Sequence, residues 1–220
     1  MRFYVVLLMS IVPAYILGSA NGAIITSKYL YRKDIRNFGS GNPGLTNFYR
    51  VFGKGGSLLV ILIDVFKTIA PVIFGGWLFG HFTTMTQSEI LLFGRSFIRA
   101  LFGQTVSGLF VMLGHCFPVF YKFKGGKGVM ALGAILIVLD WRIALISWGT
   151  FILMTATTRF VSLSAMVGAA LFPIVQLLLQ HGGAWEVSVS FMCVALLTAR
   201  HASNIKRLVK GEEPKFSFHS

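Results

Sequence analysis

The residues best suited to chemistry gather in one polar stretch, from Phe38 to Arg50. Its glycines let backbone N–H groups approach a ligand closely, and its serine, threonine and asparagine side chains add neutral hydrogen-bond donors. Arg50 offers a planar guanidinium that can bind a phosphate or carboxylate through two hydrogen bonds. The stretch exceeds what a simple turn needs and predicts an anion site. The residues expected to bind the anion are Gly39, Ser40, Gly41, Asn42, Gly44, Thr46, Asn47 and Arg50.

A second stretch, residues 122–128, combines glycine-exposed backbone with lysine charge. Backbone nests that bind phosphate have this composition. Membrane topology alone would account for the lysines, but it does not explain the glycines. We therefore expect a second anion site here. Its candidate ligands are Lys124, Gly125, Gly126, Lys127 and Gly128.

Near the C-terminus, Arg200, His201, Asn204 and Arg207 fall close to one face of an expected helix. Cations at a helix C-terminus complement the helix dipole, which accounts for arginines but not for the His201 and Asn204 pair. These two residues are therefore further candidates for the site.

Asp64, Lys67 and His115 are polar residues placed within or at the ends of apolar stretches. Asp64 and Lys67 are three residues apart and can pair near a membrane, so a structural pair and a binding role are both open. His115 precedes Cys116, but neighbours on a helix point in different directions, which disfavours a Cys-His nucleophile. We keep Lys67 and His115 as candidate binding residues.

Two nucleotide motifs are excluded. Gly39, Gly41 and Gly44 match the dinucleotide fingerprint formally, but that motif requires a β-α-β unit, which has no place between two apolar spans. A Walker A motif ending at Lys127 would need glycine where Tyr121 stands. The two cysteines show no metal-ligand spacing, so we expect neither a metal nor a cofactor.

The composition is that of a polytopic membrane protein. The chain has 220 residues, of which 55% are hydrophobic and 12% charged, and its mean hydropathy is +0.74. The net charge of +13 suits anionic substrates and anionic membrane lipid. Nucleic acid is not an expected partner, because the cations are divided among short loops instead of forming one stripe.

An all-α fold with about seven membrane spans is predicted, since a span needs roughly 20 apolar residues. All but four of the 20 lysines and arginines fall on one side if the 28–54 loop is cytoplasmic. This puts the N-terminus outside, the C-terminus in the cytoplasm, and both anion sites at the cytoplasmic face. A surface-lying helix is expected over 81–99. The spans lie near 3–27, 56–80, 100–119, 128–141, 143–158, 160–180 and 185–203.

Three ordered motifs resemble the bacterial acyl-phosphate:glycerol-3-phosphate acyltransferase family. They are G-S-G-N-x-G-x-T-N-x-x-R at 39–50, G-H-x-F-P-V-F-x-x-F-K-G-G-K-G-V at 114–129, and R-H-x-x-N-I-x-R-L-x-x-G-x-E at 200–213. The resemblance covers nearly the whole chain. It implies one polytopic domain over residues 1–220, in the bacterial cytoplasmic (inner) membrane. The implied reaction moves a fatty acyl group from acyl phosphate to the sn-1 hydroxyl of glycerol 3-phosphate, giving lysophosphatidate and phosphate.

The resemblance also implies roles for the candidate residues. Gly125, Gly126 and Gly128 would hold the donor phosphate, and the soluble enzyme that forms acyl phosphate becomes a potential coupled partner. No covalent nucleophile is required, and His115, His201 or a substrate phosphate are all open as the base. Implied catalytic residues are Ser40, Arg50, Lys127, His201 and Asn204.

Two other classes compete with this interpretation. A membrane transporter of a phosphorylated anion would use the same loops as a substrate vestibule, but it predicts charge near the middle of several spans. A lipid-binding scaffold would not need two glycine-rich anion sites.

Overall fold

A computed structural model describes residues 3–83 and 99–217, and every regular element within these ranges is a helix. Most of the surface helix expected over 81–99 falls outside the described residues. Two short 3₁₀ turns, Ile35–Asn37 and Val119–Tyr121, lie in the connections. The α-helices are α1 (Phe3–Gly18), α2 (Gly22–Tyr31), α3 (Leu45–Phe52), α4 (Lys54–Phe82), α6 (Arg99–Cys116), α7 (Val129–Leu139), α8 (Trp141–Thr158), α9 (Val161–Leu178), α10 (Ala184–Arg200) and α11 (Ala202–Val209).

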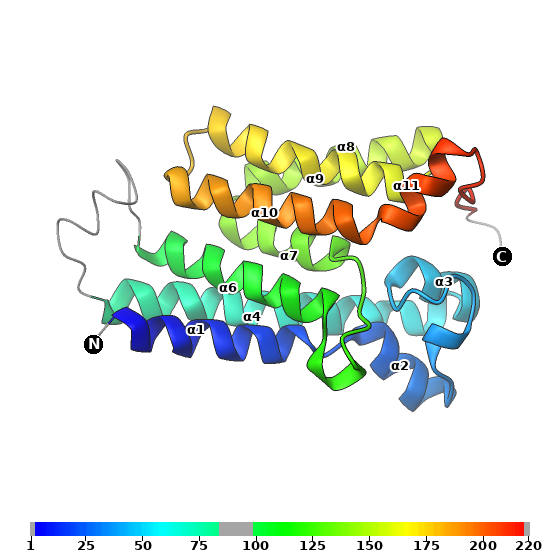
Figure 1. The fold of residues 1–220 in the computed structure, drawn as a ribbon, viewed down its shortest axis with the longest axis horizontal. Coiled ribbons are helices and arrows are strands. Elements are labelled where there is room, and N and C mark those ends of the chain that lie inside the picture. Colours follow the sequence, from blue (N-terminus) through cyan, green and yellow to red (C-terminus); the bar gives the residue numbers. More distant parts are fainter. Residues whose placement is uncertain (1–2, 84–98, 218–220) are drawn as a thin grey trace.

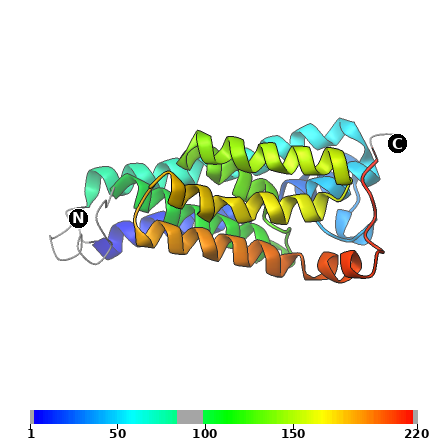
Figure 2. The same ribbon diagram turned by 90° about the horizontal axis from the view of Figure 1, so that it is seen from above.

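The long helices run side by side along one axis in two groups (Figure 1). Helices α1, α4 and α6 pack together, and α8, α9 and α10 form the other group, which Figure 2 shows from above. The short helix α7 contacts α4 and α6 on one side and α8 and α9 on the other. It therefore joins the two groups.

Small residues let the first group pack closely. A side chain added at Gly114 of α6 would overlap the backbone of α1 at Tyr15, and one added at Gly75 of α4 would overlap Ser107 of α6. Helices in membranes commonly approach through such residues, because lipid supplies no hydrophobic drive for larger interfaces.

Three helices of the described residues, α4, α6 and α9, are long and apolar enough to cross a membrane. The pair α1 and α2, bent by 41°, makes up to four if it counts as one span. Helices α7, α8 and α10 lie over the remaining predicted spans but are not among the helices that meet this criterion of length and composition.

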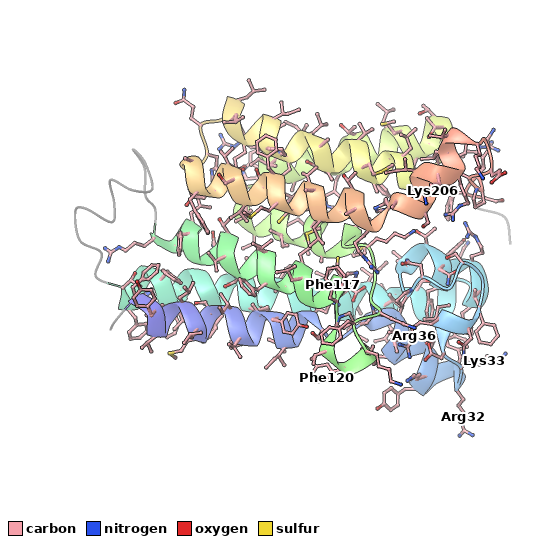
Figure 3. The ribbon with its side chains drawn as sticks, viewed as in Figure 1. Arg32, Lys33, Arg36, Phe117, Phe120 and Lys206 are labelled. Carbon is pink, nitrogen blue, oxygen red and sulfur yellow. The ribbon has the colours of Figure 1, made fainter. Side chains whose placement is uncertain are left out.

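One end of the bundle gathers the short elements and many cations. Helices α2, α3 and α11 and the C-terminal tail lie at this end, and the start of α1 lies at the other (Figure 1). Arg32, Lys33, Arg36 and Lys206 all lie at this end (Figure 3). The three sequence motifs thus end up together, although they are far apart in the chain.

Candidate active site

A cavity of about 480 Å³ opens at this end between α3, the N-terminal ends of α7 and α9, helix α8, helix α11 and the C-terminal tail. It brings together most of the residues proposed from the sequence. Outside its lining are Gly41, Lys67, Lys124, Gly125 and Gly126. The predicted residues that line it are Gly39, Ser40, Asn42, Gly44, Thr46, Asn47, Arg50, His115, Lys127, Gly128, His201 and Asn204.

Asn47 shapes the loop that carries Ser40. Its Oδ1 accepts from the Ser40 N–H at 2.9 Å, and its Nδ2 donates to the Phe38 carbonyl at 3.0 Å. Gly39 between them has a φ of 58°, and a side chain there would overlap the Asn47 amide. Buried Asn47 therefore positions the loop, with both ends of its amide engaged by the protein.

Asn21 is a second support for this loop that the sequence interpretation missed. Its Nδ2 donates to the Pro43 carbonyl at 3.0 Å, while its Oδ1 accepts from Ile24 N–H at 2.9 Å as the N-cap of α2. The available signal was an asparagine directly before an apolar helix, which is a typical N-cap.

Four helices begin at the cavity. Leu45 of α3, Val129 of α7 and Val161 of α9 are the first residues of their helices and line it, as does His201, which precedes α11. The first N–H groups of a helix have no partner within the helix, and the dipole makes that end positive. Converging N-termini therefore make the cavity suitable for anions before any side-chain charge is counted.

A hydrogen-bond array ties Lys127 to the C-terminal region. Lys127 Nζ donates to Asn204 Oδ1 at 2.5 Å, and Asn204 Nδ2 donates to Glu213 Oε1 at 2.6 Å. Glu213 also accepts from Arg207 Nε at 2.7 Å and from Ser162 Oγ at 2.6 Å. Asn204 thus orients Lys127, and Glu213 fixes Asn204 and Arg207 in turn.

This environment changes two ionisations. Burial lowers the pKa of Lys127 to about 8, and the neighbouring positive charge of Arg207 acts in the same direction. Burial favours protonated Glu213, but hydrogen bonds from Ser162, Asn204 and Arg207 outweigh it and hold the pKa of Glu213 below its usual value. Near neutral pH the array therefore contains an anionic Glu213 and a Lys127 that is still mostly protonated but loses its proton at a lower pH than a free lysine.

Arg50 is the exposed cation of the cavity. No hydrogen bond or ion pair among residues 3–83 and 99–217 engages its guanidinium. It contrasts with Arg207, which is paired with Glu213. The full donor fork of Arg50 is therefore available to an anionic ligand.

The 122–128 loop differs from the expected nest. The Gly126 N–H donates to the His115 carbonyl at 3.1 Å, so it does not face the cavity. Arg200 holds the loop by donating to the carbonyls of Gly125 and Gly126 at 2.9 and 3.1 Å. Side chains at either glycine would overlap the end of α6.

The Gly126 N–H is thus used within the protein, and both glycines permit close packing against the end of α6. Gly128, Val129 and Met130 at the start of α7 line the cavity, and the first N–H groups of a helix have no partner within the helix. Lys124 is exposed outside the cavity.

A buried ionic cluster stands behind the cavity wall. Lys67 Nζ lies 2.9 Å from Asp64 Oδ1 and 3.1 Å from His115 Nδ1, and it donates to the Ala20 carbonyl at 2.6 Å. Asp64 Oδ1 also accepts the Gly22 N–H at 3.0 Å. Asp64 and His115 line the cavity, whereas Lys67 does not. Lys67 therefore does not contact the cavity itself and can affect a ligand there only by positioning Asp64 and His115.

An apolar crevice adjoins the polar cavity. Val129, Trp148, Phe151 and Ala165 line both, and the crevice continues between α7, α8, α9 and α10. Trp148 Nε1 donates to the Gly133 carbonyl at 3.3 Å, which fixes the indole at the junction. The crevice encloses only about 30 Å³, so it can take the first carbons of an apolar tail whose charged head lies in the cavity.

The C-terminal tail closes one side of the cavity. Phe216 N–H donates to the Arg159 carbonyl at 2.8 Å, and its ring lies 5.8 Å from that of Tyr49. Pro214 and Phe216 line the cavity. Sequence reasoning did not assign these residues, because a short polar tail carries no periodic pattern that would place it.

The known proteins to which this chain is similar share one description. The family model "Glycerol-3-phosphate acyltransferase" matches residues 8–211. A glycerol-3-phosphate acyltransferase of Staphylococcus aureus (strain Newman) is 35% identical over 99% of this chain and 100% of the relative. One from Thioalkalivibrio sulfidiphilus is 37% identical over 93% of this chain and 91% of the relative.

Two solved structures have the same fold. The glycerol 3-phosphate form of PlsY (YgiH), an integral membrane glycerol 3-phosphate acyltransferase, superposes with a TM-score of 0.82, at 29% identity and 96% coverage of both chains. The lysophosphatidic acid form gives a TM-score of 0.79, at 27% identity over 96% of this chain and 95% of that one. The chain therefore belongs to the glycerol-3-phosphate acyltransferase family.

Proposed function

We propose that this protein transfers a fatty acyl group from acyl phosphate to the sn-1 hydroxyl of glycerol 3-phosphate, the first acylation of phospholipid synthesis. The proposal rests mainly on one observation: a cationic cavity, at which four helices begin, adjoins an apolar crevice. Two anionic heads are assigned to the cavity, and the acyl tail is assigned to a path that begins at the crevice and continues into the lipid. The known forms of PlsY contain glycerol 3-phosphate or lysophosphatidic acid, which are the acceptor and the product of such a reaction.

The membrane setting follows from the same bundle. We assign one domain with seven spans to the bacterial cytoplasmic membrane, with α1 starting outside and the cavity at the cytoplasmic face. The cations at the cavity end support this orientation. A cytoplasmic cavity can receive glycerol 3-phosphate from solution and acyl phosphate from the soluble enzyme that forms it.

Glycerol 3-phosphate is assigned to the side of the cavity that carries the free guanidinium. Arg50 binds its phosphate through the donor fork, and Ser40 adds a hydroxyl from the loop that Asn47 holds. Lys127, oriented by Asn204, and His201 complete the set. The other loop residues are Gly39, Gly41, Asn42, Gly44 and Thr46, of which Gly41 and Gly44 shape the backbone by donating their N–H groups to the carbonyls of Phe38 and Asn42.

Acyl phosphate is assigned to the start of α7 and the adjoining crevice. The N–H groups of Gly128, Val129 and Met130 face its phosphate, and Lys127 adds positive charge as the leaving phosphate develops. The acyl chain then lies along Trp148 between α7, α8 and α9.

The chemical step needs little from the protein beyond positioning. The sn-1 oxygen attacks the acyl carbonyl carbon, the bond from that carbon to the phosphate oxygen breaks, and phosphate leaves with the electron pair. The hydroxyl proton passes to a phosphate dianion, whose second pKa near 6 suits this role. The products are lysophosphatidate and phosphate.

The donor assay tests this function. Purified protein receives labelled glycerol 3-phosphate with acyl phosphate, acyl-CoA or acyl carrier protein as donor. We expect labelled lysophosphatidate only with acyl phosphate. Absence of product with every donor, together with uptake of glycerol 3-phosphate into proteoliposomes, would instead establish the transporter.

A further inference from the structure

The contacts of Lys67 determine the state of His115. An ammonium group has three N–H donors and no acceptor. In this structure Asp64 Oδ1, Ala20 O and His115 Nδ1 surround Lys67 Nζ at 2.9, 2.6 and 3.1 Å. The first two are oxygens that only accept, so each takes one N–H. The third N–H points at His115 Nδ1, which must therefore carry a lone pair.

A lone pair on Nδ1 places the proton of neutral His115 on Nε2. Protonation of both nitrogens would set an N–H of His115 against the ammonium of Lys67, at a contact of 3.1 Å. His115 is buried and lines the cavity, and no hydrogen bond within the described residues engages Nε2. Nε2–H is thus a neutral donor available to a ligand.

His201 is held in the opposite way. Its Nδ1 lies 2.8 Å from the Leu197 carbonyl, which only accepts, so Nδ1 carries the proton. In the neutral ring Nε2 then offers a lone pair. Both histidines line the same cavity, and in each the partner of Nδ1 decides what the other nitrogen can do.

We propose that Lys67 is a positioning residue that holds His115 as the Nε2–H tautomer. His115 then donates a hydrogen bond to the phosphate of the acyl donor and does not act as the base. The place fits the role, because His115 lines the cavity together with Lys127, Gly128 and the start of α7. This deepens the proposed function and rests on it for the identity of the ligand. Of the two histidines, only His201 can accept a hydrogen bond from a substrate hydroxyl.

The tautomer itself is measured without any activity. Protein with ¹⁵N-labelled histidine, held in micelles, is studied by two-bond ¹H–¹⁵N correlation between pH 5.5 and 8.5. The charged groups around His115 are Asp64, Lys67 and Arg200. We expect His115 as Nε2–H throughout and His201 as Nδ1–H when neutral. A proton on Nδ1 of His115, or a His115 imidazolium near pH 7, would overturn the proposal.

Two isosteric variants separate donation from structural support. In His115→Asn the shorter amide reaches the position of Nδ1 and keeps an acceptor for Lys67. In His115→Gln the longer amide reaches the position of Nε2 and keeps an N–H for the ligand. We expect His115→Gln to keep the KM for acyl phosphate within about threefold, and His115→Asn to raise it about tenfold, as loss of one hydrogen bond does. The opposite ranking would show that His115 serves only to pack Lys67.

Lys67→Met tests this role of Lys67, with Lys54→Met on the exposed start of α4 as its matched control. Without the ammonium, Nδ1 of His115 loses the N–H donor that holds its lone pair, so the pH profile of kcat/KM should differ from that of the native protein. The control should keep the native pH profile. A Lys67→Met profile identical to native would contradict this role, and if this variant does not fold, the labelled native protein still decides. Failure of the proposed reaction would leave the tautomer result unaffected.

Discussion

Arg50 is the side chain on which acceptor binding depends most. Its guanidinium lines the cavity with no partner in the described residues, so its whole donor fork faces the ligand. Lysine keeps the charge but has no planar fork. We expect Arg50→Lys to lower kcat/KM for glycerol 3-phosphate by about 100-fold, or roughly 2.7 kcal/mol, which is the scale of a charged hydrogen bond.

The control for this variant is Lys33→Arg, an exposed cation at the same end of the bundle and away from the cavity lining. It should leave both kinetic constants unchanged. If Arg50→Lys retains most of the native activity, the assignment of two hydrogen bonds to the acceptor phosphate is wrong.

Lys127 sets an alkaline limit on activity. Its pKa is lowered to about 8, and only the protonated form carries the charge that the leaving phosphate needs. Because the folded-state pKa is depressed, protonated Lys127 predominates below pH 8 and is lost as the pH rises through that value. Since kcat/KM reports the free enzyme, it should fall above pH 8. Lys127→Arg should move this limb to higher pH, and an unmoved limb would assign it to another group.

At the scale of elements, we expect the crevice between α7, α8 and α9 to bind the acyl chain. Trp148 lies where the crevice meets the cavity, and its indole is fixed on Gly133 O. Removing about 80 Å² of apolar contact costs about 2 kcal/mol, so Trp148→Ala should raise the KM for long-chain acyl phosphate about 30-fold. The KM for glycerol 3-phosphate should change little.

Trp141→Ala, at the exposed start of the same helix, is the matched control and should bind both substrates normally. Equal losses for both substrates in Trp148→Ala, with a lower unfolding temperature, would indicate general damage to the bundle instead of a chain-binding role.

The sequence predicts an element well where its residues form a pattern that only one structure requires, and poorly where the same residues serve several structures. Apolar runs placed a helix or helix pair over each expected span, because burial in lipid or core imposes that pattern. The 38–50 loop was recognisable by its donors. The roles of Gly125 and Gly126 were not, since glycine serves equally in a phosphate nest and where a loop packs on a helix end. The link from Lys127 through Asn204 to Glu213 joins motifs 77 residues apart, which no local pattern shows.

At the scale of the whole molecule, the central prediction is orientation. Lys33 lies at the cavity end, whereas Ala184 begins α10 at the other, and both are exposed. The native cysteines are buried. An impermeant maleimide applied to spheroplasts should label Ala184→Cys at once and Lys33→Cys only after the membrane is opened. The reverse pattern would place the cavity outside the cell.

Direct transfer is the claim on which the account rests: the cavity brings two substrates together, and no acyl-enzyme forms. The most direct test is to mix the protein, at high concentration, with ³²P-labelled acyl phosphate in the absence of glycerol 3-phosphate. Before the acceptor is added, we predict no burst of labelled phosphate and no acylated protein. When glycerol 3-phosphate is added, we predict rapid release of labelled phosphate. A stoichiometric burst without the acceptor, with an acyl group attached to the chain, would contradict the account.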